Sequence, residues 1–99
     1  MTTLTGLTPL QVLAVADAAL EVAETYGCAV ESMTLHRLGY VTFLTVDGDA
    51  PALAFELGLT DRIVHVYPPR PAESIEAFRG DWRGVEFAVQ HTIPTAATP

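Results

Sequence analysis

Residues 9–26 carry the pattern that most constrains this fold, an amphipathic helix with a signal at each end. Thr8 and Gln11 have the spacing of a capping box, Pro9 suits the first helical position, and Gly27 suits the stop. Apolar residues recur at helical spacing on one side: Val12, Val15, Ala16, Ala19, Val22, Ala23 and Tyr26. Because so many of them are alanine, the stripe predicts close packing, most naturally on the face of a sheet.

Two strands are predicted after this helix. Residues 28–37 alternate between apolar and polar, and residues 40–46 are rich in β-branched and aromatic side chains. Leu38 and Gly39 suit a tight hairpin turn between them. The first two strands should therefore pair as antiparallel neighbours.

The segment 49–58 fits either a strand or a short helix. Its leucine and phenylalanine residues alternate, but Asp49 can cap a helix, Pro51 is tolerated in a first turn, and Gly58 is a natural stop. We predict the helix. Asp47-Gly48-Asp49 resembles the start of a calcium loop, but the later ligand positions hold other residues, so strand turn plus helix cap is the preferred interpretation.

The C-terminal half is predicted to be mostly strand. Residues 61–67 form one strand, residues 73–79 fit strand better than helix, and residues 80–84 look like a hairpin loop leading into a last strand at 85–93. The order α-β-β-α-β-β-β predicts a single α+β domain over residues 1–93, with a loose tail at 94–99. We expect an N-terminal helix packed on an antiparallel sheet of four to five strands, with a short second helix.

The composition excludes several kinds of site. Twelve acidic residues stand against five arginines and no lysine, which gives the 99-residue chain a formal charge of −7. No lysine can form a Schiff base or a phosphate loop, and the negative field disfavours direct nucleic-acid binding. The charge permits a basic protein partner or, as a less favoured reading, DNA mimicry. The lack of both lysine and asparagine, whose codons are A/T-rich, is typical of a high-GC genome such as that of an actinobacterium or its phage.

The single cysteine, Cys28, allows no internal disulfide and no cysteine-based metal cluster. It follows a helix C-terminus, where the dipole raises a thiol pKa, so a small buried residue is the preferred interpretation over a nucleophile. The N-terminus lacks the pattern of a secretion signal, and no apolar run reaches the roughly 18 residues of a membrane helix. We therefore expect a cytoplasmic protein without membrane contact.

The three histidines, His36, His65 and His91, fall on three different predicted strands. They could assemble a metal site only if those strands were neighbours and the side chains faced one way, and no spacing supports this. Ordinary hydrogen-bonded histidines are the preferred interpretation, so no metal or cofactor is expected.

Two segments of the sequence are candidates for binding a protein partner. Residues 67–71, with Tyr67 and Arg70, favour polyproline II geometry, which either docks into aromatic grooves or, as we prefer, stiffens a connector between strands. Trp82 lies beside Arg83 and near Arg79 in the predicted loop, an arrangement typical of interface hot spots. A role for Trp82 in covering the core, with its ring folded back onto it, is an equally good interpretation.

The sequence thus predicts a small non-enzymatic domain that binds a protein partner through Trp82, Arg83, Arg79, Tyr67 and Arg70. Homodimerisation through an edge strand is a further use of the same surface. A phage or actinobacterial accessory factor, including an inhibitor of a host or defence protein, fits this pattern. The alternative is a small-molecule-binding or minimal hydrolytic domain in which His65 and His91 meet with an acidic residue in a cleft. Convergence of these groups in space would favour the alternative, whereas an exposed apolar patch or an open sheet edge would favour the binding domain.

Overall fold

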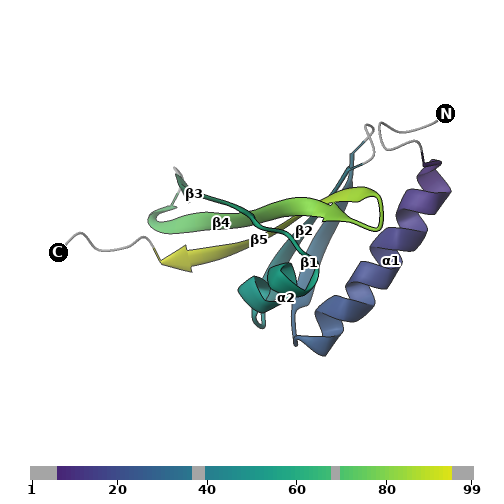
Figure 1. The fold of residues 1–99 in the computed structure, drawn as a ribbon. Coiled ribbons are helices and arrows are strands. Elements are labelled where there is room, and N and C mark those ends of the chain that lie inside the picture. Colours follow the sequence, from purple (N-terminus) through teal and green to yellow (C-terminus); the bar gives the residue numbers. More distant parts are fainter. Residues whose placement is uncertain (1–6, 37–39, 68–69, 95–99) are drawn as a thin grey trace.

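Two helices cover one face of a five-stranded sheet in the computed structural model, which describes residues 7–36, 40–67 and 70–94 (Figure 1). The predicted order α-β-β-α-β-β-β and the α+β class are confirmed. The elements are α1 (Pro9–Thr25), β1 (Ala29–Leu35), β2 (Tyr40–Asp47), α2 (Ala50–Glu56), β3 (Asp61–Tyr67), β4 (Arg70–Trp82) and β5 (Val85–Pro94). None of the helices in these ranges is long and apolar enough to cross a membrane.

The sheet differs from the prediction at one pairing. Its strand order is β1-β2-β5-β4-β3, and β2 runs parallel to β5, whereas the other neighbours are antiparallel. The sheet is therefore mixed and not wholly antiparallel. The last strand, β5, lies between the β1–β2 pair and the β3–β4 pair. Alternation of side chains within one strand does not indicate which strands will lie beside it.

Helix α1 forms as its sequence signals require. Thr8 Oγ1 accepts from the Gln11 amide at 3.2 Å, and Gln11 Oε1 accepts from the Thr8 amide at 2.8 Å, which completes the capping box. The stripe faces the sheet, with Val12, Ala16, Ala19 and Ala23 buried. Their small side chains let the helix lie close to the strands beneath it.

The core lies between the helices and the central strands. β2 contributes Val41 and Phe43, and β5 contributes the alternating Val85, Phe87 and Val89, all fully buried. The rings of Phe43 and Phe87 meet edge to face at 5.6 Å between centroids. Helix α2 covers the β4–β5 part of this layer with Leu53 and Ala54. The predicted helix at 49–58 is thereby confirmed, and Asp49 caps it by accepting from the Ala52 amide at 3.0 Å.

The strand predicted at residues 73–79 is also confirmed, but it is longer than expected and extends through Trp82. The loop predicted at 80–84 is instead a two-residue turn at Arg83 and Gly84, both with positive φ, as a type I′ hairpin requires. Strand β5 ends at Pro94, one residue beyond the predicted boundary at residue 93. The turn predicted at Leu38-Gly39, the tail at 95–99 and Pro68-Pro69 lie outside the described residues.

Candidate binding surface

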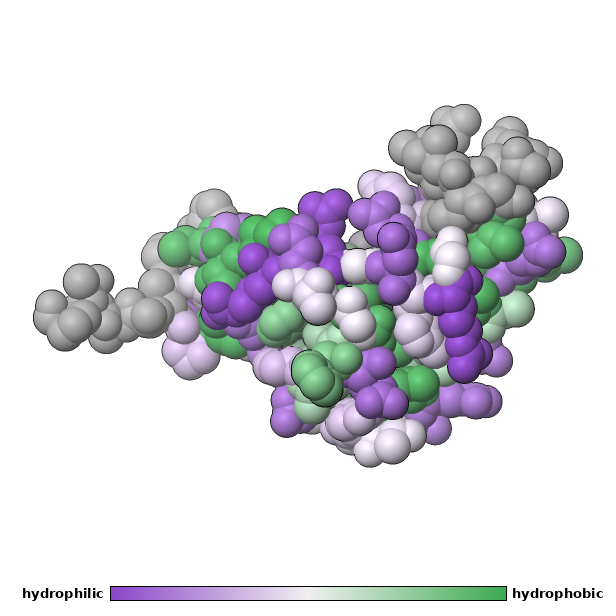
Figure 2. Space-filling model, viewed as in Figure 1, coloured by the Kyte–Doolittle hydropathy of each residue, from purple (hydrophilic) through white to green (hydrophobic). Residues whose placement is uncertain are grey.

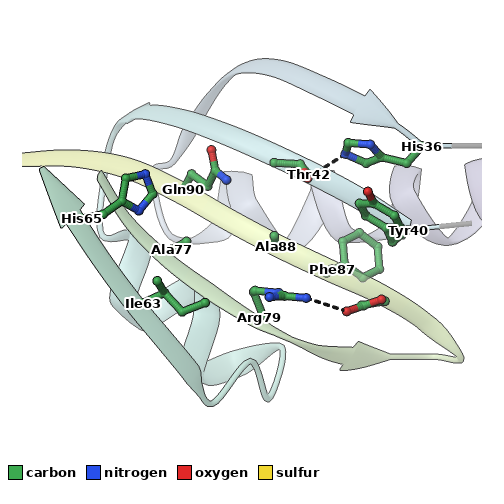
Figure 3. A pocket seen from close by; sticks show the side chains of 11 residues that line it. His36, Tyr40, Thr42, Ile63, His65, Ala77, Arg79, Phe87, Ala88 and Gln90 are labelled. Atoms are coloured by element: carbon green, nitrogen blue, oxygen red, sulfur yellow. Dashed lines mark hydrogen bonds and ion pairs between the residues drawn. The ribbon is translucent and has the colours of Figure 1, made fainter. Parts of the chain in front are cut away.

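No described residue covers the face of the sheet opposite the helices, and we call this face the open face. The β-strand alternation that buries Val41, Phe43, Phe87 and Val89 turns the residues between them toward this side. Figure 3 shows the resulting surface, to which β2, β5, β4 and β3 all contribute side chains. A hollow of about 470 Å³ lies in it.

The hollow arises from small residues on the neighbouring strands β5 and β4. Ala88 of β5 and Ala77 of β4 line its floor, and larger side chains from the flanking strands form its walls (Figure 3). In register, Thr42, Ala88 and Arg79 form one cross-strand row. Leu44, Gln90, Ala77 and Ile63 form the next row. A trough with an alanine floor can accept apolar side chains of a partner without rearrangement of its backbone.

Side-chain contacts fix several of the polar groups around the hollow. The His36 ring stacks on Tyr40 with centroids 3.9 Å apart, and His36 Nε2 shares a hydrogen bond with Thr42 Oγ1 at 3.1 Å. On the opposite side, Arg79 donates to Glu86 at 3.2 Å. These contacts hold the rim side chains in place while leaving ring faces and a charged pair accessible.

One end of the open face is acidic. A second hollow, of about 340 Å³, is lined by Asp61, Asp81 and Glu86 together with Arg79. The register explains this gathering, because Arg79 pairs with Asp61 on β3 and Asp81 pairs with Glu86 on β5. Three carboxylates around one guanidinium leave a local excess of negative charge, in keeping with the charge of the whole chain.

The two histidines of the hydrolytic alternative lie on opposite faces of the sheet. His65 lines the hollow on the open face, whereas His91 lies on the helix side and donates from Nε2 to Glu76 Oε1 at 2.6 Å. The ladder explains the separation, since His65 pairs with Ile75 and His91 with Glu76, the next residue along β4. His65 and His91 therefore do not share a cleft. Within the ranges that the structure describes, no three His, Cys, Asp or Glu side chains group closely enough to hold a metal ion.

Glu76 is a largely buried carboxylate that the sequence patterns did not single out. Besides the bond from His91, it accepts from Arg62 Nε at 2.6 Å. Burial by itself raises the pKa of Glu76, but the hydrogen bonds from His91 and Arg62 outweigh that effect and lower it. The three residues come from three strands, so only the register of the sheet brings them together.

The five predicted partner-binding residues do not form one patch. Trp82 is half-buried against the core on the helix side, meets the Phe87 ring edge to face at 5.9 Å, and carries the Arg83 guanidinium 4.2 Å from its centroid. Arg79 belongs to the open face. Tyr67 and Arg70 pair with each other at the far end of the β3–β4 hairpin. Arg70 and Pro71 belong to β4, so residues 67–71 are not a single polyproline segment.

Cys28 is buried, as predicted. Burial raises the pKa of its thiol, and the nearby Asp49 carboxylate raises it further. The thiol therefore stays protonated at neutral pH, which suits a packing residue rather than a nucleophile.

Sequence reasoning missed several residues of the open face, above all Tyr40, Ala77 and Ala88. The alternation of β5 did separate Glu86, Ala88 and Gln90 from the core residues. That signal identifies a face of one strand, but the hollow requires knowing that β5 lies between β2 and β4. No protein-family model, curated protein or solved structure significantly matches the chain.

Proposed function

We propose that this chain is a small non-enzymatic binding domain that holds a protein partner on the open face of its sheet. The observation that carries the proposal is the placement of both helices on one face, which leaves the other face hollowed around Ala77 and Ala88. The apolar floor with polar groups at its rim resembles the anatomy of protein interfaces, in which an apolar centre is ringed by polar groups.

Charge favours a basic partner. Asp61, Asp81 and Glu86 surround Arg79 at one end of the open face, and the whole chain carries a formal charge of −7. A partner segment with an apolar side chain for the alanine floor and a lysine or arginine for the acidic end would satisfy both parts of the surface. The same field speaks against a phosphate backbone as ligand. We place this activity in the cytoplasm, where a single cysteine suits the reducing conditions.

Of the residues singled out in the sequence, Arg79 lies on the open face, whereas Trp82 packs against the core on the helix side. Trp82 contacts Phe87 and the core on the helix side, so much of its apolar surface is already used in folding. Its exposed part lies across the sheet from the hollow, and partner contact through Trp82 and Arg83 would need a separate surface.

The test is capture of partners from the source cell with immobilised wild-type chain and a variant in which the floor is filled, Ala88→Arg. The arginine would occupy the hollow and repel a basic segment, so the specific partner should be lost. Phe55→Ser, on the exposed side of α2, is the matched control because Phe55 is 85% exposed and lies on the helix side.

Partners retained by the wild-type chain and by Phe55→Ser, but not by Ala88→Arg, would support the open face. Equal retention by all three chains would contradict it. Circular dichroism and urea melts of each variant establish that binding is compared between folded proteins, and cross-linking with mass spectrometry should place contacts at β4 and β5.

A further inference from the structure

Strand β3 has a free outer edge among the described residues. It is the last strand of the sheet, and its ladder to β4 is regular from Asp61 to Val66. The outer edge therefore offers a straight row of backbone N–H and C=O groups. Figure 1 shows the far end of this hairpin reaching away from both helices.

The side chains of β3 are more apolar than an exposed edge normally allows. Ile63 on the open face is 39% exposed, and Val64 and Val66 on the helix side are 41% and 49% exposed. Figure 2 shows apolar surface gathered at the end of the molecule where β3 lies. An unprotected edge with apolar groups on both faces is a template for pairing with another strand.

The opposite edge of the sheet is protected in a way that β3 is not. β1 has register shifts between Ala29 and Val30 and again between Val30 and Ser32. Such irregularities bend a strand and interrupt its row of hydrogen-bonding groups, which discourages pairing with another chain. The contrast identifies β3, and not β1, as the edge suited to association.

We propose that β3 pairs antiparallel with β3 of a second copy, about a two-fold axis at Val64, so that two five-stranded sheets become one continuous sheet. In this register Val64 faces the partner's Val64, and Ile63 faces the partner's His65. Arg62 faces the partner's Val66. No charged side chain faces a like charge, so the strand is compatible with itself, as a two-fold interface requires.

This pairing would cover both the outer backbone groups and the exposed apolar side chains of β3. The outer N–H and C=O groups gain partners, and Val64 and Val66 of both copies form one apolar strip on the helix side. Side chains directly opposite each other in a ladder point to the same face, so the two open faces would lie on the same side of the joined sheet. The inference concerns the edge and does not depend on what the open face binds.

Light scattering after size exclusion tests the oligomer with the full chain. The expected mass is about 21 kDa, twice the 10.6 kDa of one copy. Val64→Lys should shift the chain to monomer, because two ammonium groups would meet at the axis, and Val64→Asp should do the same. An equimolar mixture of these two variants should restore the dimer. Val46→Lys is the matched control, since Val46 is 57% exposed but lies on β2, and it should stay dimeric.

The register is tested by cysteine cross-linking. Val64→Cys should form a disulfide-linked dimer under mild oxidation, because the two residues face each other across the axis. Val66→Cys should not, because its counterpart would lie about four residues, or ~13 Å, along the ladder. Buried Cys28 is retained in both chains.

Several outcomes would overturn the inference. A monomeric wild-type chain at high concentration excludes a β3 dimer, and a Val64→Lys dimer places the interface elsewhere. Failure of the mixed Lys and Asp variants to associate, with both folded by circular dichroism, rejects the axis at Val64. Salt separates this contact from open-face binding: added NaCl should tighten association of two chains of charge −7 and weaken capture of a basic partner.

Discussion

Gly48 lies directly against the backbone of Gly27, so that a Cβ atom at Gly48 would overlap the Gly27 carbonyl group. The contact joins the end of β2 to the end of α1, next to the N-cap of α2. Gly48 also has φ of +89°, a region that side-chain-bearing residues rarely adopt. Both the backbone conformation and the close approach therefore require glycine at this position.

Gly48→Ala should destabilise the fold by at least about 2 kcal/mol, because backbone strain adds to a clash with atoms that cannot move aside cheaply. Gly58→Ala is the control: Gly58 has φ of +69°, but a Cβ there would meet nothing within 4 Å. It should cost only the conformational term of about 1 kcal/mol. Urea denaturation of the two variants measures the difference, and equal costs would refute the close approach as the main cause.

Thr8→Ala should lower the free energy of unfolding by about 0.5–2 kcal/mol, because the first turn of α1 loses the acceptor for the Gln11 amide. Thr8→Asp should retain most of the stability, since its carboxylate can accept the same bond. Thr60→Ala, at an exposed loop position, is the control: it measures how much a Thr→Ala substitution changes the free energy of unfolding where no helix is capped. A Thr8→Ala melt that coincides with the Thr60→Ala melt would show that the capping box contributes nothing.

Glu76 should make stability fall as the solution is acidified. Its pKa is lowered in the folded protein, so the unfolded chain takes up the proton first and the contribution of Glu76 is lost as pH falls below its ordinary pKa of about 4.3. Glu76→Gln should cost about 1–2 kcal/mol at neutral pH, because Arg62 and His91 lose a charged acceptor. Urea melts between pH 7 and pH 3 should show the gap between the variant and the parent closing in acid.

Glu86→Gln is the matched control for this pH series. Glu86 also forms an ion pair with an arginine, but both side chains are about half exposed, so the substitution should change stability by less than about 1 kcal/mol. A Glu76→Gln gap that stays constant with pH, or that equals the gap of Glu86→Gln, would contradict the assigned role of the buried carboxylate.

Trp82→Ala should destabilise the protein by about 1–3 kcal/mol, less than a fully buried tryptophan, because the side chain is only half-buried against Phe87 and the core. Trp82 is the sole tryptophan, so fluorescence reports on it directly. We expect native emission blue-shifted from that of the unfolded chain, with partial quenching by acrylamide. Fully red-shifted native emission together with an unchanged melt would show that Trp82 is an exposed anchor instead.

The sequence by itself determined the elements whose signals are local. The limits of α1 were specified by Thr8, Pro9 and Gln11 at its start and by Gly27 at its end. Its alanine stripe specified the face that meets the sheet. Asp49 and Gly58 distinguished a helix from a strand at 49–58. Caps, stops and side-chain periodicity act between residues close in sequence, so they can be identified before the chain is folded.

Only the tertiary structure decided how the hairpins join into one sheet, since β2 pairs with β5, which is far from it in the sequence. The insertion of β5 between β2 and β4 made the sheet mixed and brought Ala88 beside Ala77 and Thr42 to form the hollow. The same register put His65 and His91 on opposite faces. Strand alternation specifies two faces for each strand but not its partners, because pairing depends on how distant segments together bury one core. The open face and the free edge of β3 are therefore products of the assembled sheet.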